Sequence, residues 1–487
     1  MPTKSISDLA RVVDQRLKHD GVPSPGVRAL IELLDAVYFT SLKTEEGKPL
    51  QIRIVLVDPS NPDPDPPRPG YARPDRWKIT KLANQLPLTV PTLIKLSKAA
   101  DPWSSSLAVY YDSDCRFFVW GLVDQTVHFN TQLVRESDAG GYAPPGIFQV
   151  VAYGTADLSV YREFSFVARL QQDRLFKRQN DVFSSGPVRD RLTEGVKRHI
   201  TSVKQALKEP IRQRFLRDWG ESISDWNESI AGHWLSTICR LLISIQRYRH
   251  GGAVLITNSR ANLDIKYKIN YSRLPKALTR LWTSRITANT ARDEIGEHLD
   301  RKQDMIPAWF YLEETVENGE AEDCEDEITG CVRFIASLSC VDGLVLASPD
   351  LTIRGFGVEI RPKKEVDAAY LASSPRAPEG GLRKIDPSHY GTRHRSMMRY
   401  RYAHPNSLGF VISQDGEIRV MTRVGGKLVM WENLEVFSFF ESDSETKSKQ
   451  QQKLASRAPS PATPSAASDR SVSRTVKIPI ERESKSE

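Results

Sequence analysis

Hydrophobic positions recur at helical spacing in three stretches of the chain, which predicts helices over residues 6–17, 26–38 and 226–248. Alternating or continuous apolar runs predict strands over residues 51–57, 107–111, 116–123, 148–153 and 253–257. The turn signals between residues 107 and 165 indicate a compact α+β module. The helix that ends at Gly251-Gly252 before an apolar strand is typical of the start of an α/β domain.

The polar stretches set the expected boundaries. Proline and aspartate in residues 58–74 predict an exposed loop, and residues after 442 hold almost no large apolar side chains, which predicts disorder. Residues 186–219 read as a charged helix, either a solvated linker or, alternatively, a nucleic-acid contact. The later pattern predicts helices over residues 275–282, 291–305 and 328–338 and an acidic loop over 317–327. The expected parts are an α+β domain over residues 1–185, a basic helical linker over 186–225, an α/β domain over 226–441 and a tail over 442–487.

Composition is that of a globular protein, with 39% hydrophobic and 26% charged residues. A chain of 487 residues is too long to fold around one ordinary core. No apolar run is long enough to span a bilayer, and the start lacks the apolar stretch of a secretory signal. The five cysteines form no CxxC pair, so we expect reduced thiols in a cytoplasmic protein. The net charge of +7 says little about function, because much of it lies in the tail and one helix.

Three motifs in the last third of the chain carry candidate chemistry. Asp342-Gly343-Leu344 closes an apolar run, where Gly343 allows a ligand near the backbone and Asp342 could meet a metal ion or a ribose hydroxyl. An Asp-Gly pair at a strand end is also an ordinary turn signal. A later hairpin carries Ser413, Gln414 and Asp415 in its turn, and by itself it reads as a plain β-turn.

The remaining motif, Gly391-Thr392-Arg393-His394-Arg395, is the most specific of the three. Arginine grips phosphate through a bidentate fork, and the amides after Gly391 lie at a predicted helix N-terminus, which favours anions. Thr392 can donate its hydroxyl to a phosphate oxygen, and His394 can donate to phosphate or orient a metal-bound water. The alternative is the basic first turn of a solvated helix.

In order and context these motifs resemble the diadenylate cyclase domain, the enzyme fold that joins two ATP molecules into cyclic di-AMP. That family carries Asp-Gly-Ala on a strand, Gly-Thr-Arg-His-Arg on a later loop, and a serine with acidic residues in a following hairpin. The resemblance covers residues 226–440 and includes the strand that begins Gly252-Ala253. More loosely, the N-terminal two hundred or so residues resemble a probable sensor module called DACNV, best at residues 120–124 and 145–154.

The resemblance implies a mixed β-sheet flanked by helices that binds ATP, preceded by an α+β sensor-like domain with an unknown ligand. Two domains would meet face to face in a homodimer or higher oligomer, each 3′-hydroxyl attacking the α-phosphorus of the other ATP and expelling pyrophosphate. Asp342 would hold Mg²⁺ or Mn²⁺ and meet the attacking hydroxyl. The catalytic set would be Asp342, Arg393, His394 and Arg395, and ATP would also contact Gly343, Leu344, Gly391, Thr392, Ser413 and Asp415.

The chain departs from the family pattern at several points. Leu344 replaces an alanine, and Gln414 replaces an acid, which leaves Asp415 as the only carboxylate of its turn. Residues 363–387 lengthen the connection between the two main motifs, and an insertion follows Ser272. No phosphate-gripping residue is lost, so an active enzyme is expected. The alternative is an inactive nucleotide receptor; neither a membrane nor a nucleic-acid partner is expected, because the basic helix lacks interleaved aromatic residues.

Overall fold

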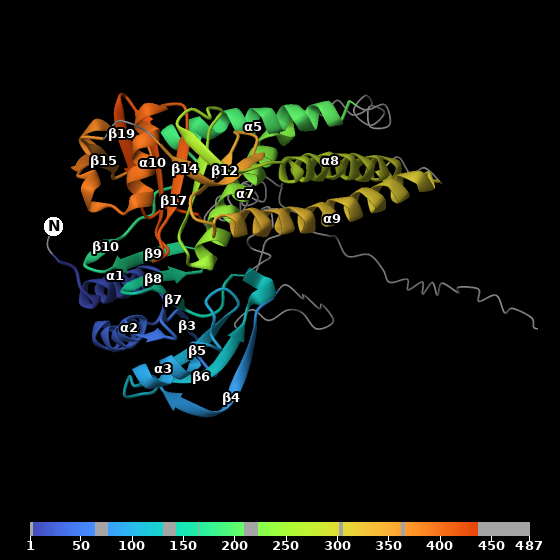
Figure 1. Ribbon diagram of the computed structural model, residues 1–487. Helices are drawn as coiled ribbons and strands as arrows, with labels where there is room; N and C mark the ends of the chain where they lie inside the picture. The colour runs from blue at the N-terminus through green and yellow to red at the C-terminus, as the bar shows by residue number, and fades with distance from the viewer. Residues whose placement is uncertain are drawn as a thin grey trace, which may run out of the picture. The chain divides into compact units, whose positions relative to one another are not determined.

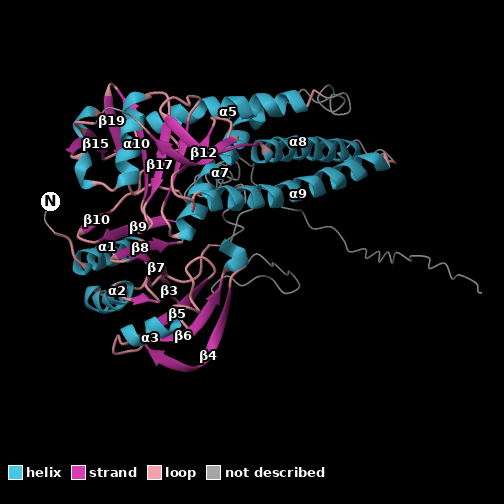
Figure 2. Ribbon diagram, in the orientation of Figure 1, coloured by secondary structure: helices cyan, strands magenta, loops and turns pink. Residues whose placement is uncertain are grey.

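The computed structural model describes residues 3–63, 76–129, 143–163, 165–208, 223–300, 305–361 and 366–436. All described residues belong to one compact unit of the chain. Two mixed β-sheets with packed helices build this unit (Figures 1 and 2). The predicted mixed α/β class is therefore confirmed. The expected disordered tail and most of the proline-rich loop lie outside the described residues.

The N-terminal sheet has the strand order β10-β9-β8-β7-β3-β5-β6-β4. Central β3 is buried along its whole length, since Ile52 and Ile54 pack beneath the helices while Val55 faces Trp77 and Trp120 on the opposite side. β3 is parallel to β5 and antiparallel to β7. The elements of this part are α1 (Ile6–His19), α2 (Val27–Ser41), β1 (Thr44–Glu45), β2 (Lys48–Pro49), β3 (Ile52–Leu56), β4 (Lys78–Pro87), α3 (Val90–Leu96), β5 (Ser105–Tyr111), β6 (Phe117–Asp124), β7 (Phe148–Gly154), β8 (Asp157–Arg162), β9 (Ser165–Gln171) and β10 (Arg174–Phe176).

The C-terminal sheet has the order β12-β14-β13-β11-β17-β18-β19-β15-β16. Alternation along β11 separates its faces, because Val254 joins the cluster of α7 while Ala253 and Leu255 join Met397 of α10. The remaining elements are α5 (Pro187–Ala206), η1 (Ile223–Trp226), α7 (Asn227–Tyr248), β11 (Gly252–Ile256), β12 (Leu263–Tyr271), α8 (Arg273–Asp300), α9 (Ala308–Leu338), β13 (Leu344–Ala347), β14 (Ile353–Ile360), β15 (Ala369–Ala372), η2 (Glu379–Gly381), β16 (Leu382–Ile385), η3 (Pro387–His389), α10 (Thr392–Ala403), β17 (Leu408–Ile412), β18 (Ile418–Val424) and β19 (Lys427–Trp431).

The segment after Ser272 forms a long helical hairpin of α8 and α9, and here two expectations were wrong. α8 is continuous rather than two helices, and the acidic stretch 317–327 is helical rather than a loop. Glutamate is a good helix former, and Ala321, Cys324 and Ile328 give α9 an apolar stripe that buries in the core. Arginines of α8 pair with the acidic face, as Arg273 does with Glu327 at 2.5 Å.

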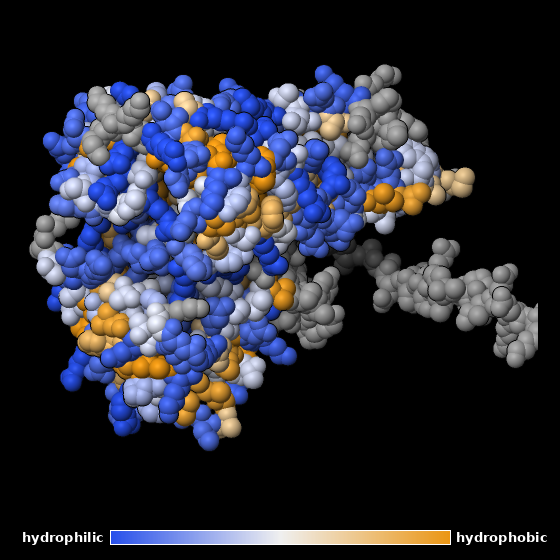
Figure 3. Space-filling view, in the orientation of Figure 1, coloured by the Kyte–Doolittle hydropathy of each residue, from blue (hydrophilic) through white to orange (hydrophobic). Residues whose placement is uncertain are grey.

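The free end of this hairpin exposes large hydrophobic side chains. Leu299, Met305 and Leu312 are each more than half exposed, and apolar surface is visible at this end in Figure 3. Across the described ranges, no helix is both long and apolar enough to cross a membrane. All five cysteines lie in the described ranges, and each is a free thiol, as predicted.

The packing of α5 yields a matched pair of stability predictions. A Cβ at Gly195 would lie 2.5 Å from Trp234 Cζ2 and would also meet the Pro349 carbonyl oxygen, whereas a Cβ at Gly232 on α7 meets nothing within 4 Å. We expect Gly195→Ala to lower the free energy of unfolding by about 1–3 kcal/mol through overpacking. Gly232→Ala should raise it by up to about 1 kcal/mol through helix propensity. Urea denaturation measures both, and equal effects would contradict the packing argument.

The buried His199 of α5 predicts that the folded protein loses stability in acid. Burial lowers the pKa of His199 to about 4, so the ring is neutral at pH 7. An unfolded histidine has a pKa of about 6.5. As the pH falls from 6.5 toward 4, the unfolded chain gains a proton that the folded chain does not, and stability is lost. The free energy of unfolding should fall between pH 7 and pH 5, and by less in His199→Leu; an equal fall would exclude His199 as a contributor.

Candidate functional site

A cavity of about 910 Å³ opens at the C-terminal sheet, where the start of β13, the start of α10 and the β17–β18 turn come together. Its volume is within the range of small-molecule sites. It is lined by every predicted site residue except Arg395, namely Asp342, Gly343, Leu344, Gly391, Thr392, Arg393, His394, Ser413 and Asp415. Three sequence motifs that are far apart in the chain thus share one cavity.

The Asp342 motif precedes β13 in a close packing arrangement. Gly343 has a φ of 113°, and a Cβ there would lie 2.6 Å from the carbonyl carbon of Gly357 on β14. Glycine is therefore required by the neighbouring strand, whatever ligand the cavity takes. The Asp342 side chain is fully exposed to solvent, and its Oδ1 lies 3.8 Å from Arg393 Nη2. Leu344 lines the cavity but is itself 95% buried in the apolar cluster of α10.

The second motif forms the start of α10, as predicted. Gly391 is the N-cap residue, and the Arg395 amide makes the first helical hydrogen bond to the Gly391 carbonyl. The unpaired backbone amides of the first turn of α10 direct the positive end of the helix dipole toward the cavity. Arg393 Nη1 donates to the His250 carbonyl oxygen at 3.2 Å, which fixes the guanidinium at the same edge. This edge suits an anionic ligand.

His394 is buried beneath this edge and lines the cavity. Burial lowers its pKa to about 4, with a smaller contribution from the positive charge of Arg419. The ring is therefore neutral at pH 7, and its Nε2, 3.2 Å from Arg419 Nη1, accepts from that guanidinium. Arg419 in turn lies 5.8 Å from the ring centre of Tyr390. In this arrangement His394 positions Arg419.

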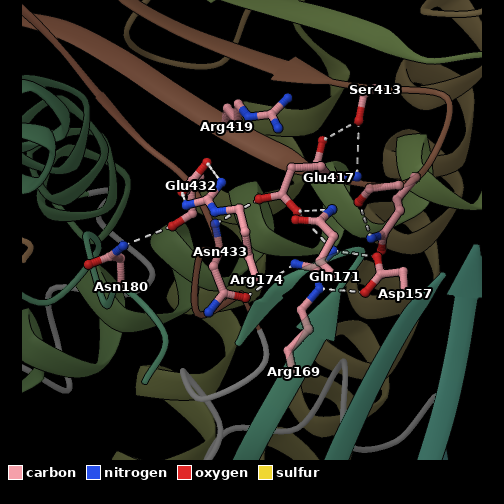
Figure 4. A network of polar contacts seen from close by, with 12 residues as sticks. Asp157, Arg169, Gln171, Arg174, Asn180, Ser413, Glu417, Arg419, Glu432 and Asn433 are labelled. Carbon is pink, nitrogen blue, oxygen red and sulfur yellow. Dashed lines mark hydrogen bonds and ion pairs between the residues drawn. The ribbon is translucent and has the colours of Figure 1, made fainter. Parts of the chain in front are cut away.

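The third motif is the turn between β17 and β18, where the predicted hairpin is confirmed. Ser413 closes it, because its amide donates to the Glu417 carbonyl at 2.9 Å and its Oγ accepts from the Glu417 amide at 3.1 Å. Figure 4 shows Ser413 above the buried Glu417 carboxylate. Ser413, Gln414 and Asp415 line the cavity, while Glu417 points away into a polar network. The hydroxyl of Ser413 thus has a structural task in the turn.

Arg395 is exposed on α10 and does not line the cavity. No group of three or more His, Cys, Asp or Glu able to hold a metal occurs in the part of the chain that the structure describes. Magnesium commonly takes only one or two protein carboxylates and completes its shell with water and substrate phosphate. The exposed Asp342 carboxylate fits that mode of binding.

The cavity residues that sequence reasoning missed include Tyr390 and Arg419. Tyr390 directly precedes the Gly391 motif, so its position was a usable signal. Arg419 lies between the buried Ile418 and Val420, and this alternation along β18 places it on the opposite face from them. The alternation could have identified the face, but only the packing of α10 shows that this face borders the cavity.

Several solved structures match the chain, and one of them shows how weak the similarity is. A hypothetical membrane spanning protein from Bacillus cereus is 12% identical, with a TM-score of 0.20, and the match covers 49% of this chain and 93% of that chain. A similarity at that TM-score supports no conclusion about the fold. No curated protein matches the chain.

The family comparison concerns the N-terminal part. Residues 19–124 match the family described as the probable sensor domain DACNV, from the end of α1 to the end of β6. The match includes the expected segment 120–124, whereas the expected segment 145–154 lies beyond it. The cyclase resemblance of the C-terminal domain stays a prediction. Residues 19–124 are thus similar to a probable sensor domain.

Proposed function

We propose that the chain is a diadenylate cyclase whose C-terminal domain condenses two ATP molecules into cyclic di-AMP under the control of the N-terminal probable sensor domain. The observation that carries this proposal is the gathering of the three motifs, represented by Asp342, Thr392 and Asp415, around one cavity. A cytoplasmic location, where ATP is abundant, suits this activity.

The cavity has complementary regions for the parts of ATP. The α10 N-terminus and Arg393 offer amides and a guanidinium to the triphosphate. The apolar wall contributed by Leu344, Val358 and Met397 offers contact to the adenine ring. Arg419, held by the neutral His394, adds a second cation to the cavity lining. These residues bind and orient the nucleotide; none is needed as a covalent catalyst.

The reaction joins each 3′-oxygen to the α-phosphorus of the other ATP, breaks the bond to the β-phosphate oxygen, and releases two pyrophosphates and two protons. One cavity holds one ATP, so the scheme requires two domains face to face in a homodimer or higher oligomer. A bound Mg²⁺ or Mn²⁺ would neutralise phosphate charge beside Asp342, whose exposed carboxylate is accessible to the 3′-hydroxyl of the ATP in the facing domain.

One observation keeps a second function open. The cavity is lined by Gln414 and Leu344, at two of the positions where the sequence departs from the cyclase pattern. A receptor that binds ATP and forms no product would have the same phosphate-binding edge. Nucleotide binding without cyclic product would select this alternative.

Removing the Asp342 carboxylate tests the catalytic proposal. With ATP and Mg²⁺ or Mn²⁺, the wild-type protein should form cyclic di-AMP, identified by mass spectrometry. Asp342→Asn should lower the rate on the order of 100-fold, as loss of a preorganised charge in a site does. The control is Asp367→Asn, an exposed aspartate outside the cavity, which should match the wild type. Equal product from all three proteins would remove Asp342 from the mechanism.

The two arginines of the α10 motif are predicted to differ. Arg393 lines the cavity and Arg395 does not. Arg393→Ala should cost about 2–4 kcal/mol of transition-state stabilisation, because phosphate charge is left unmatched. ATP affinity, measured by calorimetry, should fall more in Arg393→Ala than in Arg395→Ala. The reverse order would place the triphosphate elsewhere.

A further inference from the structure

The turn that borders the cavity is held from outside its own sheet by two residues of β9. Arg169 Nη2 lies 2.8 Å from Glu417 Oε2, and Gln171 Nε2 donates to the same oxygen at 3.0 Å. The other carboxylate oxygen, Oε1, accepts a hydrogen bond from the backbone amide of Asn433 at 2.8 Å. Two of these three partners of Glu417 therefore belong to the N-terminal sheet (Figure 4).

The guanidinium of Arg169 is shared between the two sheets. On its own side, Arg169 pairs with Asp157 of β8 through contacts of 2.7 and 2.5 Å. Asp157 and Glu417 are almost fully buried and Arg169 is largely so, so each charge depends on the others for compensation. Burial alone raises the pKa of Glu417, but the charges of Arg169 and Arg419 outweigh it and the net shift is downward. Glu417 is thus a buried carboxylate that stays ionised while Arg169 is in place.

Further contacts hold the same turn. A Cβ at Gly154, at the end of β7, would lie 2.9 Å from the Asp415 carbonyl oxygen, so the N-terminal sheet touches the turn backbone directly. From the other side, Gln246 of α7 donates to the Gly416 carbonyl at 2.6 Å. Ser413, Gln414 and Asp415 of this turn line the cavity. A shift of β7 and β9 is therefore transmitted by direct contacts to the turn, whose residues line the cavity.

The sensor-like segment is connected to these strands by continuous pairing. β3, inside the matched residues 19–124, pairs with β7; β7 pairs with β8, and β8 pairs with β9. A ligand that moves this sheet would withdraw Arg169 and Gln171 together and leave the buried Glu417 carboxylate with the Asn433 amide. Such a state favours rearrangement of the turn.

We propose that Arg169 is a positioning residue, through which the N-terminal sheet sets the conformation of the 413–417 turn and thereby the nucleotide affinity and turnover of the C-terminal cavity. The part that concerns nucleotide rests on the proposed function. The part that concerns the turn does not, and a ligand-free measurement tests it separately.

The experiment uses the full chain with Arg169→Met, which removes the charge and keeps most of the side-chain volume. The matched control is Arg162→Met on β8, because Arg162 has a similar burial and pairs within the N-terminal part, with Asp20 at 3.3 Å. Amide hydrogen exchange by mass spectrometry reports the 413–417 turn without any nucleotide. Calorimetry with ATP reports the cavity, and steady-state kinetics separates KM from kcat.

Arg169→Met should speed exchange at the turn and weaken ATP binding about tenfold, in the usual range of coupling between sites. Arg162→Met should leave both as in the wild type. Arg169→Lys should recover part of each effect, and the double variant Arg169→Met/Glu417→Gln should lose less than the sum of the single losses. If Arg169→Met does not fold, Arg169→Lys carries the same comparison with Arg162→Lys.

Unchanged exchange at the turn in a folded Arg169→Met protein would overturn the proposal, as would equal effects of Arg162→Met and Arg169→Met. A wild-type chain that binds no ATP would overturn the proposed function instead. In that case the exchange measurement alone still decides whether Arg169 positions the turn.

Discussion

The arrangement of the cavity depends on the pairing of β11 with a strand on each side. Val254 of this strand is opposite Val345 of β13 and opposite Phe410 of β17. Because β13 is parallel and β17 antiparallel to β11, the start of β13 and the end of β17 lie at the same end of the sheet. Asp342 precedes one and Ser413 follows the other. Their proximity is therefore a result of sheet register rather than of any direct contact between them.

Much of this could be predicted from the sequence because the signals were local. Apolar alternation identified β11 and the β17–β18 hairpin, and the Gly391 motif lies at a helix start as its residues suggest. The acidic stretch 317–327 was misread, because a high density of charge resembles a loop unless the buried Ala321 and Cys324 are counted at helical spacing. The role of Arg169 had no local signal. Its partner Glu417 is nearly 250 residues away, and only the folded chain brings them together.

Charged side chains are compensated differently at the cavity and behind the β17–β18 turn. At the cavity, Asp342 and Thr392 are exposed, so solvent or a ligand can satisfy them. At the back of the β17–β18 turn, Glu417 and Glu432 are buried and take their partners from β9 and β10, as with Arg174 and Glu432. Because one short turn carries both the cavity-lining residues and the buried Glu417, a change of conformation at Glu417 also affects the cavity lining. The charges of Glu417 and Glu432 are thus compensated in part by arginines of the N-terminal sheet.

The helical hairpin has a mechanical consequence of its own. α9 is continuous over 31 residues, which at 1.5 Å per residue gives a rod of about 45 Å. One end carries the exposed apolar tip, and the other ends at Leu338, four residues before Asp342. A stiff rod fixed near its base converts sideways force at the tip into torque at the base. A force applied to the tip would therefore be transmitted along α9 toward Leu338 and the nearby Asp342 carboxylate.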